Sequence, residues 1–174
     1  MEKYTIISAS NRQDNKTQLF ADLCSKLLTE MGIDNQVYNL QQLPVSLIGE
    51  GMYDFDNSPM ADIVEKYLKP VNKLVFVIPE YNGSFPGVLK LFIDAIHPRY
   101  FKGKQAALLG IASGRSGNVR GMEHLTGILH YLKMEVFHNK LPISSIDRML
   151  SNDVINDDET IELIRSQMMA YRNF

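Results

Sequence analysis

The sequence predicts an α/β fold in which helices cover both faces of a five-stranded parallel sheet of order 2-1-3-4-5. Apolar strand-like runs alternate with helix-period segments along the chain, which is typical of parallel strands joined by crossover helices. The runs Lys73–Ile78 and Ala106–Ala112 are almost continuously hydrophobic, as expected of strands buried on both faces. The 174 residues, 45% of them hydrophobic, are enough for one sizeable core. We therefore expect a single domain over residues 1–174.

The elements can be assigned in chain order. The first residues enter a strand pattern at once, and Phe20, Leu23, Leu27 and Met31 then recur at helical spacing. The second strand precedes a long irregular connection, Gln41–Ser58, of a length that is often functional but equally suits a solvated excursion. The predicted strands are Tyr4–Ser8, Gln36–Leu40, Lys73–Ile78, Ala106–Ala112 and Glu135–His138, and the predicted helices are Thr17–Met31, Pro59–Leu68, Pro86–Ile96, Val119–Leu132 and Asp158–Tyr171.

Charge and composition exclude several classes of protein. The net charge is −2 and no basic block is present, so binding to nucleic acid or to a membrane surface is not expected. No apolar run approaches the ~18 residues of a transmembrane helix, and the N-terminus does not resemble a secretory signal, so we expect a cytoplasmic protein.

The single cysteine, Cys24, falls on the apolar face of the first helix and is expected to be a buried thiol. The four histidines lack metal-site spacing, so no metal is expected.

The loops after the first, third and fourth strands are polar or rich in glycine. They comprise Ser8–Thr17, Pro79–Gly87 and Ala112–Gly121. In an open parallel sheet the ligand binds outside the carboxyl ends of the strands, where these loops converge. The first loop places hydroxyls and Arg12 before a helix N-terminus, which suits a phosphate. Capping of that helix by Asn15 or Thr17 is the alternative interpretation.

Missing motifs narrow the choice of ligand. The first loop lacks the G-x-G-x-x-G pattern of a dinucleotide-binding fold and the G-x-x-x-x-G-K-[ST] pattern of a triphosphate site. A single terminal phosphate fits better, which favours FMN over FAD or ATP. In the second loop, Gly83 and Gly87 allow close approach of the backbone, and Asn82 and Ser84 can meet the edge of a planar heterocycle.

The stretch from Pro79 to Ile96 closely resembles the PEYNGS-x-PG-x-LK-x-x-ID signature of the NADPH-dependent FMN reductase family. The first loop resembles the family's G-S-x-R-x-x-S-x-[ST] phosphate loop, with Ala9 in place of the usual glycine. The third resembles its G-x-S-x-G-x-x-G-G segment, with Asn118 in place of the last glycine. The resemblance extends from about Tyr4 to Tyr131 and implies a flavodoxin-like fold.

The resemblance further implies an FMN-dependent oxidoreductase that uses NADPH or NADH in a ping-pong cycle, with hydride delivered to the exposed flavin face. The acceptor would be a flavin, quinone, azo compound or metal oxyanion. No catalytic side chain is implied, because the flavin performs the chemistry. The implied contacts to FMN are Ser10, Arg12, Asn15 and Thr17 for the phosphate, Pro79, Glu80, Tyr81, Asn82, Gly83 and Ser84 for the ring, and Ser113 and Gly114 for its remaining edge.

Two other functions remain open from the sequence: a flavodoxin-like electron carrier, and a relative that has lost its flavin and serves as a binding module. Family resemblance also implies a homodimer, or a tetramer, built on Pro86–Ile96 and Val119–Leu132. Tyr100 and Phe101 are candidate interface anchors, unless one of them covers the local core. Preference for NADPH over NADH would require a placed cation, for which the sequence offers Arg99, Lys102, Arg115 and Arg120.

Overall fold

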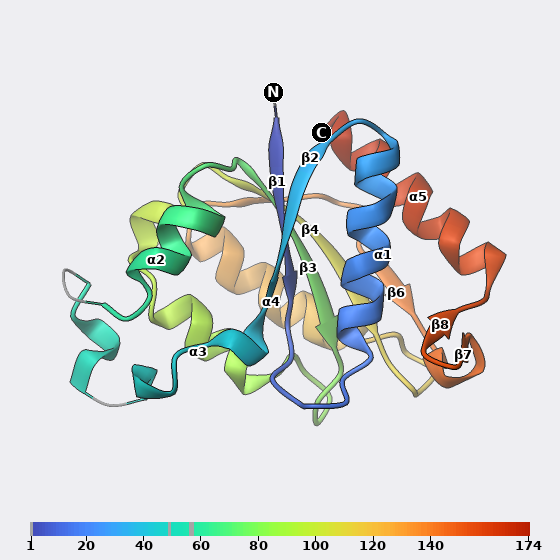
Figure 1. Cartoon of the computed structure of the whole chain (residues 1–174), viewed down its shortest axis with the longest axis horizontal. Coiled ribbons are helices and arrows are strands. Elements are labelled where there is room, and N and C mark those ends of the chain that lie inside the picture. Colours follow the sequence, from blue (N-terminus) through green and yellow to red (C-terminus); the bar gives the residue numbers. More distant parts are fainter. Residues whose placement is uncertain (1, 49, 56–57) are drawn as a thin grey trace.

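The computed structural model describes residues 2–48, 50–55 and 58–174. Its main sheet has the order β2-β1-β3-β4-β5, with β6 also paired to β4 (Figure 1). All pairings within this sheet are parallel, so the predicted fold class is confirmed. The strands are β1 (Lys3–Ser8), β2 (Asp34–Asn39), β3 (Lys73–Pro79), β4 (Gln105–Ile111), β5 (Glu135–Val136) and β6 (Leu141–Ile143).

Helices cover the two faces of the sheet and enclose two hydrophobic cores. On one side lie α1 (Thr17–Glu30) and α5 (Asp158–Arg172). On the other lie α2 (Ala61–Ile63), α3 (Gly87–Asp94) and α4 (Val119–Tyr131) (Figure 1). Every residue of β3 is buried, which explains the apolar sequence that follows Lys73, whose ammonium donates to the carbonyls of Tyr171 and Arg172.

The last part of the sheet differs from the prediction. The strand expected over Glu135–His138 ends at Val136, where it pairs only with the start of β4. The chain then returns as β6, which pairs with Leu109–Ile111 at the other end of β4. An antiparallel hairpin of β7 (Leu150–Ser151) and β8 (Val154–Ile155) follows. Its turn residues Asn152 and Asp153 have φ of 50° and 58°, as a two-residue hairpin requires.

Two further segments also depart from simple expectation. The helix expected over Pro59–Leu68 begins at Ala61 and continues from Val64 to Leu68 as a π-helix. The connection Gln41–Ser58 contains short 3₁₀ turns at Leu40–Gln42, Val45–Leu47 and Glu50–Tyr53, while Gly49 and residues 56–57 lie outside the described residues.

Burial decides the roles of two side chains. Cys24 is fully buried, as expected, and burial raises the pKa of its thiol to about 12, so it stays protonated at neutral pH. Phe101 is also fully buried, in the core beneath α3 and α4. It therefore covers the local core and is excluded as an interface anchor, whereas Tyr100 is only partly buried.

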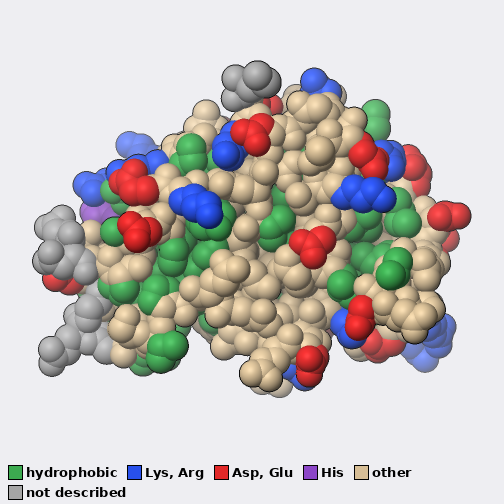
Figure 2. Space-filling view, viewed as in Figure 1, with side chains coloured by type: hydrophobic (Ala, Val, Ile, Leu, Met, Phe, Trp, Pro, Cys, Tyr) green, Lys and Arg blue, Asp and Glu red, His purple; other side chains and the backbone are tan. Residues whose placement is uncertain are grey.

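Figure 2 shows that Lys and Arg side chains stand among Asp and Glu side chains on the displayed face, in keeping with the small net charge. None of the helices within the described ranges has the length and apolar character needed to cross a membrane.

Candidate functional site

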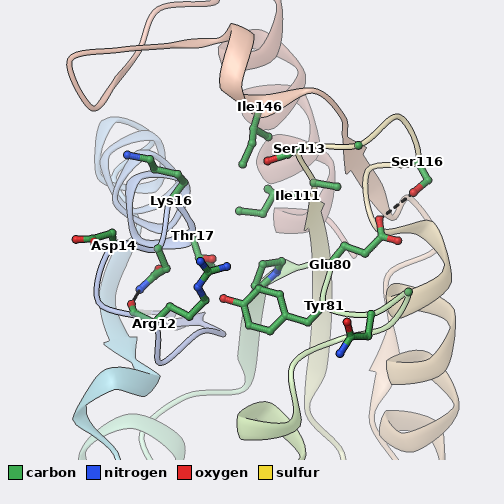
Figure 3. A pocket seen from close by; sticks show the side chains of 16 residues that line it. Arg12, Asp14, Lys16, Thr17, Glu80, Tyr81, Ile111, Ser113, Ser116 and Ile146 are labelled. Atoms are coloured by element: carbon green, nitrogen blue, oxygen red, sulfur yellow. Dashed lines mark hydrogen bonds between the residues drawn. The ribbon is translucent and has the colours of Figure 1, made fainter.

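A cleft of about 520 Å³ lies outside the carboxyl ends of β1, β3 and β4 (Figure 3). The three predicted loops form it together, as the strand order requires. Its lining residues are Arg12, Asp14, Asn15, Lys16 and Thr17 from the first loop, Pro79, Glu80, Tyr81, Asn82 and Gly83 from the second, Ile111, Ala112, Ser113, Gly114 and Ser116 from β4 and the third, and Ile146.

Backbone hydrogen bonds fix the start of each loop to a neighbouring strand. The amide of Ala9 donates to the carbonyl of Val77, and the amide of Glu80 donates to that of Ile111. The amide of Ala112 donates to the carbonyl of Ile143. The loops therefore begin at fixed positions relative to one another. Ala9 has no positive φ, so this turn needs no glycine.

The first loop holds one free cation and one paired cation at the cleft. Arg12 is exposed and makes no ion pair with the described residues. Lys16 Nζ lies 2.5 Å from Asp153 Oδ1 in the β7–β8 turn, and this hydrogen bond raises the pKa of Lys16. Asn15 accepts a hydrogen bond from the amide of Gln18 through Oδ1. Its side chain therefore satisfies one amide in the first turn of α1, close to the capping role of the alternative interpretation, although the N-cap position is Lys16. Asn15 also lines the cleft.

A hydrogen bond joins the first and second loops. The hydroxyls of Ser10 and Tyr81 lie 2.6 Å apart, and the guanidinium of Arg12 lies 5.7 Å from the centre of the Tyr81 ring. Ser10 also accepts a hydrogen bond from the amide of Arg12. Ser10 is buried and does not line the cleft, so here it holds the two loops together.

The tip of the second loop turns through Asn82 and Gly83, with φ of 51° and 73°. The following residue, Ser84, faces away from the cleft, and its Oγ lies 2.9 Å from Nδ1 of His124 on α4. Like Ser10, it is a predicted cofactor residue that the structure places outside the cleft lining. Sequence position alone could not show this, because adjacent loop residues face different neighbours.

The third loop is fixed to the second at the opposite end of the cleft. Ser116 Oγ donates a hydrogen bond of 2.9 Å to the carboxylate of Glu80 (Figure 3). Asn118 has φ 63°, and its side-chain amide donates to the carbonyl of Ile78. Asn118 therefore supplies the left-handed conformation and ties the loop to β3.

Several lining residues were not among the predicted contacts. Asp14, Lys16, Ala112 and Ser116 lie within the predicted loops, so their loop position was the available signal. Ile146 lies in a 3₁₀ turn after β6, and nothing in the sequence links that turn to the first loop.

The residues present fit a flavin mononucleotide. A free guanidinium and the N-terminus of the 14-residue helix α1 stand at one end of the cleft, where a phosphate would be stabilised. Backbone and small side chains at Gly83, Ser113 and Gly114 leave room for a planar ring. The cleft volume is in the range of known cofactor sites.

A family model described as NADPH-dependent FMN reductase matches residues 3–147. An NAD(P)H-dependent FMN reductase of Pseudomonas aeruginosa is 32% identical over 148 residues, which cover 82% of this chain and 79% of that protein. A 2-hydroxy-1,4-benzoquinone reductase of Burkholderia is 31% identical over 113 residues, covering 58% of this chain and 62% of that protein. Among solved structures, a flavoenzyme NAD(P)H:(acceptor) oxidoreductase from Paracoccus denitrificans superposes with a TM-score of 0.74 at 20% identity, covering 98% of this chain and 95% of that one.

Proposed function

This chain belongs to the NADPH-dependent FMN reductase family, and we propose that its cleft binds one FMN and that it uses NADPH or NADH to reduce a small acceptor. The acceptor class comprises free flavins, quinones, azo compounds and metal oxyanions. The observation that carries the proposal is the meeting of three loops in one cleft with a free guanidinium at one end. When bound, FMN supplies the hydride and electron transfer.

The protein's part is to bind and orient the cofactor. At the phosphate end we assign Arg12, Thr17 and the N-terminus of α1, because charge-assisted hydrogen bonds and the helix dipole both favour a dianion there. Asn15 holds the turn that presents them. Ser10 supports the site by binding Tyr81 and the amide of Arg12.

At the ring end, we assign the second loop from Pro79 to Gly83 to one side of the flavin and Ser113 with Gly114 to the remaining edge. Glu80 and Ser116 tie these loops together, so the width of the slot is set before the ring enters. A ring held in this way keeps one face open, which a nicotinamide and an acceptor would occupy in turn.

Among the acceptors, a quinone is the first to test, because the Burkholderia relative is described as a benzoquinone reductase. Protein reconstituted with FMN should carry about one flavin per chain, as expected of a single crevice of this kind. Initial rates over a grid of NADPH and benzoquinone concentrations should give parallel double-reciprocal lines.

Intersecting lines would contradict the shared-face mechanism. Bound flavin without NAD(P)H oxidation would favour an electron carrier, and no FMN binding at micromolar concentrations would favour a flavin-free binding relative.

We also propose a homodimer through α3 and α4. A second cavity of about 620 Å³ lies between these helices, and its lining includes Tyr53, Phe55, Ile128 and Tyr131. Tyr131 is 86% exposed, and large aromatic side chains are enriched at interfaces.

Tyr131→Glu should shift the protein from dimer to monomer, because a carboxylate in an apolar contact loses hydration without gaining a partner. Light scattering at micromolar concentration measures this. Met169→Glu, at an exposed apolar position on α5, is the matched control and should leave the mass unchanged. A monomer mass for the wild-type protein in the same measurement would contradict the proposed dimer.

A further inference from the structure

Arg120 is a cation without a partner at the ring end of the cleft. It lies in the first turn of α4, its side chain is exposed, and it makes no ion pair or hydrogen bond with the described residues. Its guanidinium rests against the tip of the second loop, since a Cβ on Gly83 would stand 2.9 Å from Nη1 of Arg120. Gly83 itself lines the cleft.

The charged and polar side chains near Arg120 already have hydrogen-bond or ion-pair partners within the chain. Glu80 accepts the hydrogen bond from Ser116, and His124, one turn after Arg120 on the same helix face, is bonded to Ser84. Glu123 forms an ion pair with Lys140. Arg12, at the other end of the cleft, is assigned to the phosphate of FMN. Arg120, which lies against Gly83, is therefore a cation that a ligand extending past Gly83 would meet.

We propose that Arg120 binds an anionic group of the substrate that occupies the exposed ring face. This inference rests on the proposed function. The anionic group would be a phosphate or a sulfonate, which a guanidinium binds through paired, charge-assisted hydrogen bonds. Two sources supply such a group: the phosphates of the nicotinamide dinucleotide and an acidic substituent on the acceptor.

Gly83 is part of this arrangement. A side chain at position 83 would meet the guanidinium as well as impose φ 73° on a residue with a Cβ. The glycine thus leaves the space in which Arg120 lies beside the loop, in addition to leaving the ring accessible.

The test compares Arg120→Ala and Arg120→Lys with Arg115→Ala in FMN-loaded protein. Neither Arg115 nor Arg120 is part of the cleft lining, but only Arg120 lies against Gly83, so removal of the exposed Arg115 in the third loop controls for loss of one positive charge nearby. One arm measures binding of NADP⁺ and NAD⁺ by calorimetry. The other measures KM for 1,2-naphthoquinone and for its 4-sulfonate at saturating NADPH.

Arg120→Ala should weaken binding of at least one of the anionic ligands by about tenfold, the loss expected for a charge-assisted contact, while KM for the neutral quinone is unchanged. Arg120→Lys should retain part of the effect because it keeps the charge without the planar fork. Weaker binding of NADP⁺ alone would identify the 2′-phosphate as the group that Arg120 binds, and equally weaker binding of NADP⁺ and NAD⁺ would identify the pyrophosphate. A higher KM for the sulfonate alone would identify the acidic substituent of the acceptor.

Equal effects of Arg115→Ala and Arg120→Ala, or no effect in either arm, would overturn the proposal. So would a change of oligomeric state in Arg120→Ala with no selective effect on anions, which would make Arg120 an interface residue. Failure of the wild-type protein to reduce the neutral quinone would count against the proposed function, and the NADP⁺ arm would still decide the role of Arg120.

Discussion

Arg12→Ala is expected to weaken FMN binding by about a hundredfold while changing riboflavin binding by no more than about threefold. The guanidinium is exposed at the cleft and has no carboxylate partner among the described residues, so its charge is available to a ligand. Hydrogen bonds to charged groups contribute about 1.5–3 kcal/mol each, and a factor of ten in affinity corresponds to about 1.4 kcal/mol.

Riboflavin is the internal control, because it has the same ring and ribityl chain without the phosphate. Fluorescence titration of both ligands with wild-type and Arg12→Ala protein measures the difference. Arg12→Lys should recover part of the FMN affinity through its charge alone. Equal losses for FMN and riboflavin would place the role of Arg12 at Tyr81, whose ring its guanidinium approaches, and not at the phosphate.

Gly110→Ala is expected to destabilise the fold by about 3 kcal/mol and to lower Tm by roughly 10 °C. A Cβ at this position of β4 would lie 2.4 Å from the carbonyl oxygen of Gly117 and 2.9 Å from Cε of Met122. Met122 has a flexible side chain, but the Gly117 oxygen belongs to the backbone of the third loop. The loop would have to move off the strand, so FMN affinity should fall as well.

Gly87→Ala is the matched control. A Cβ there meets nothing within 4 Å and φ is not positive, so stability should be unchanged or higher by up to about 1 kcal/mol. Thermal unfolding of the FMN-free proteins separates the two variants. A Tm for Gly110→Ala equal to that of Gly87→Ala would contradict the close approach of β4 and the third loop.

The strand order 2-1-3-4-5 and the loops of the cleft could be predicted from the sequence, whereas β6 could not. β3 is buried along its whole length, and a strand with both faces against helices is largely apolar, so the run Lys73–Ile78 could be predicted as a central strand. Most of the predicted cofactor residues line one cleft, because parallel strands bring the loops at their carboxyl ends to a single edge.

Which side chains face that cleft depends on tertiary contacts that the sequence pattern does not show. Ser10 and Ser84 are polar loop residues like their neighbours, yet one binds Tyr81 and the other His124, partners more than 35 positions away in the sequence. Ile146 reaches the site because β6 pairs with the outer half of β4, and Arg120 lies at its edge because Gly83 leaves space for it. A local pattern records which segments must be buried, whereas the direction of a loop side chain depends on atoms that the fold brings from distant parts of the chain.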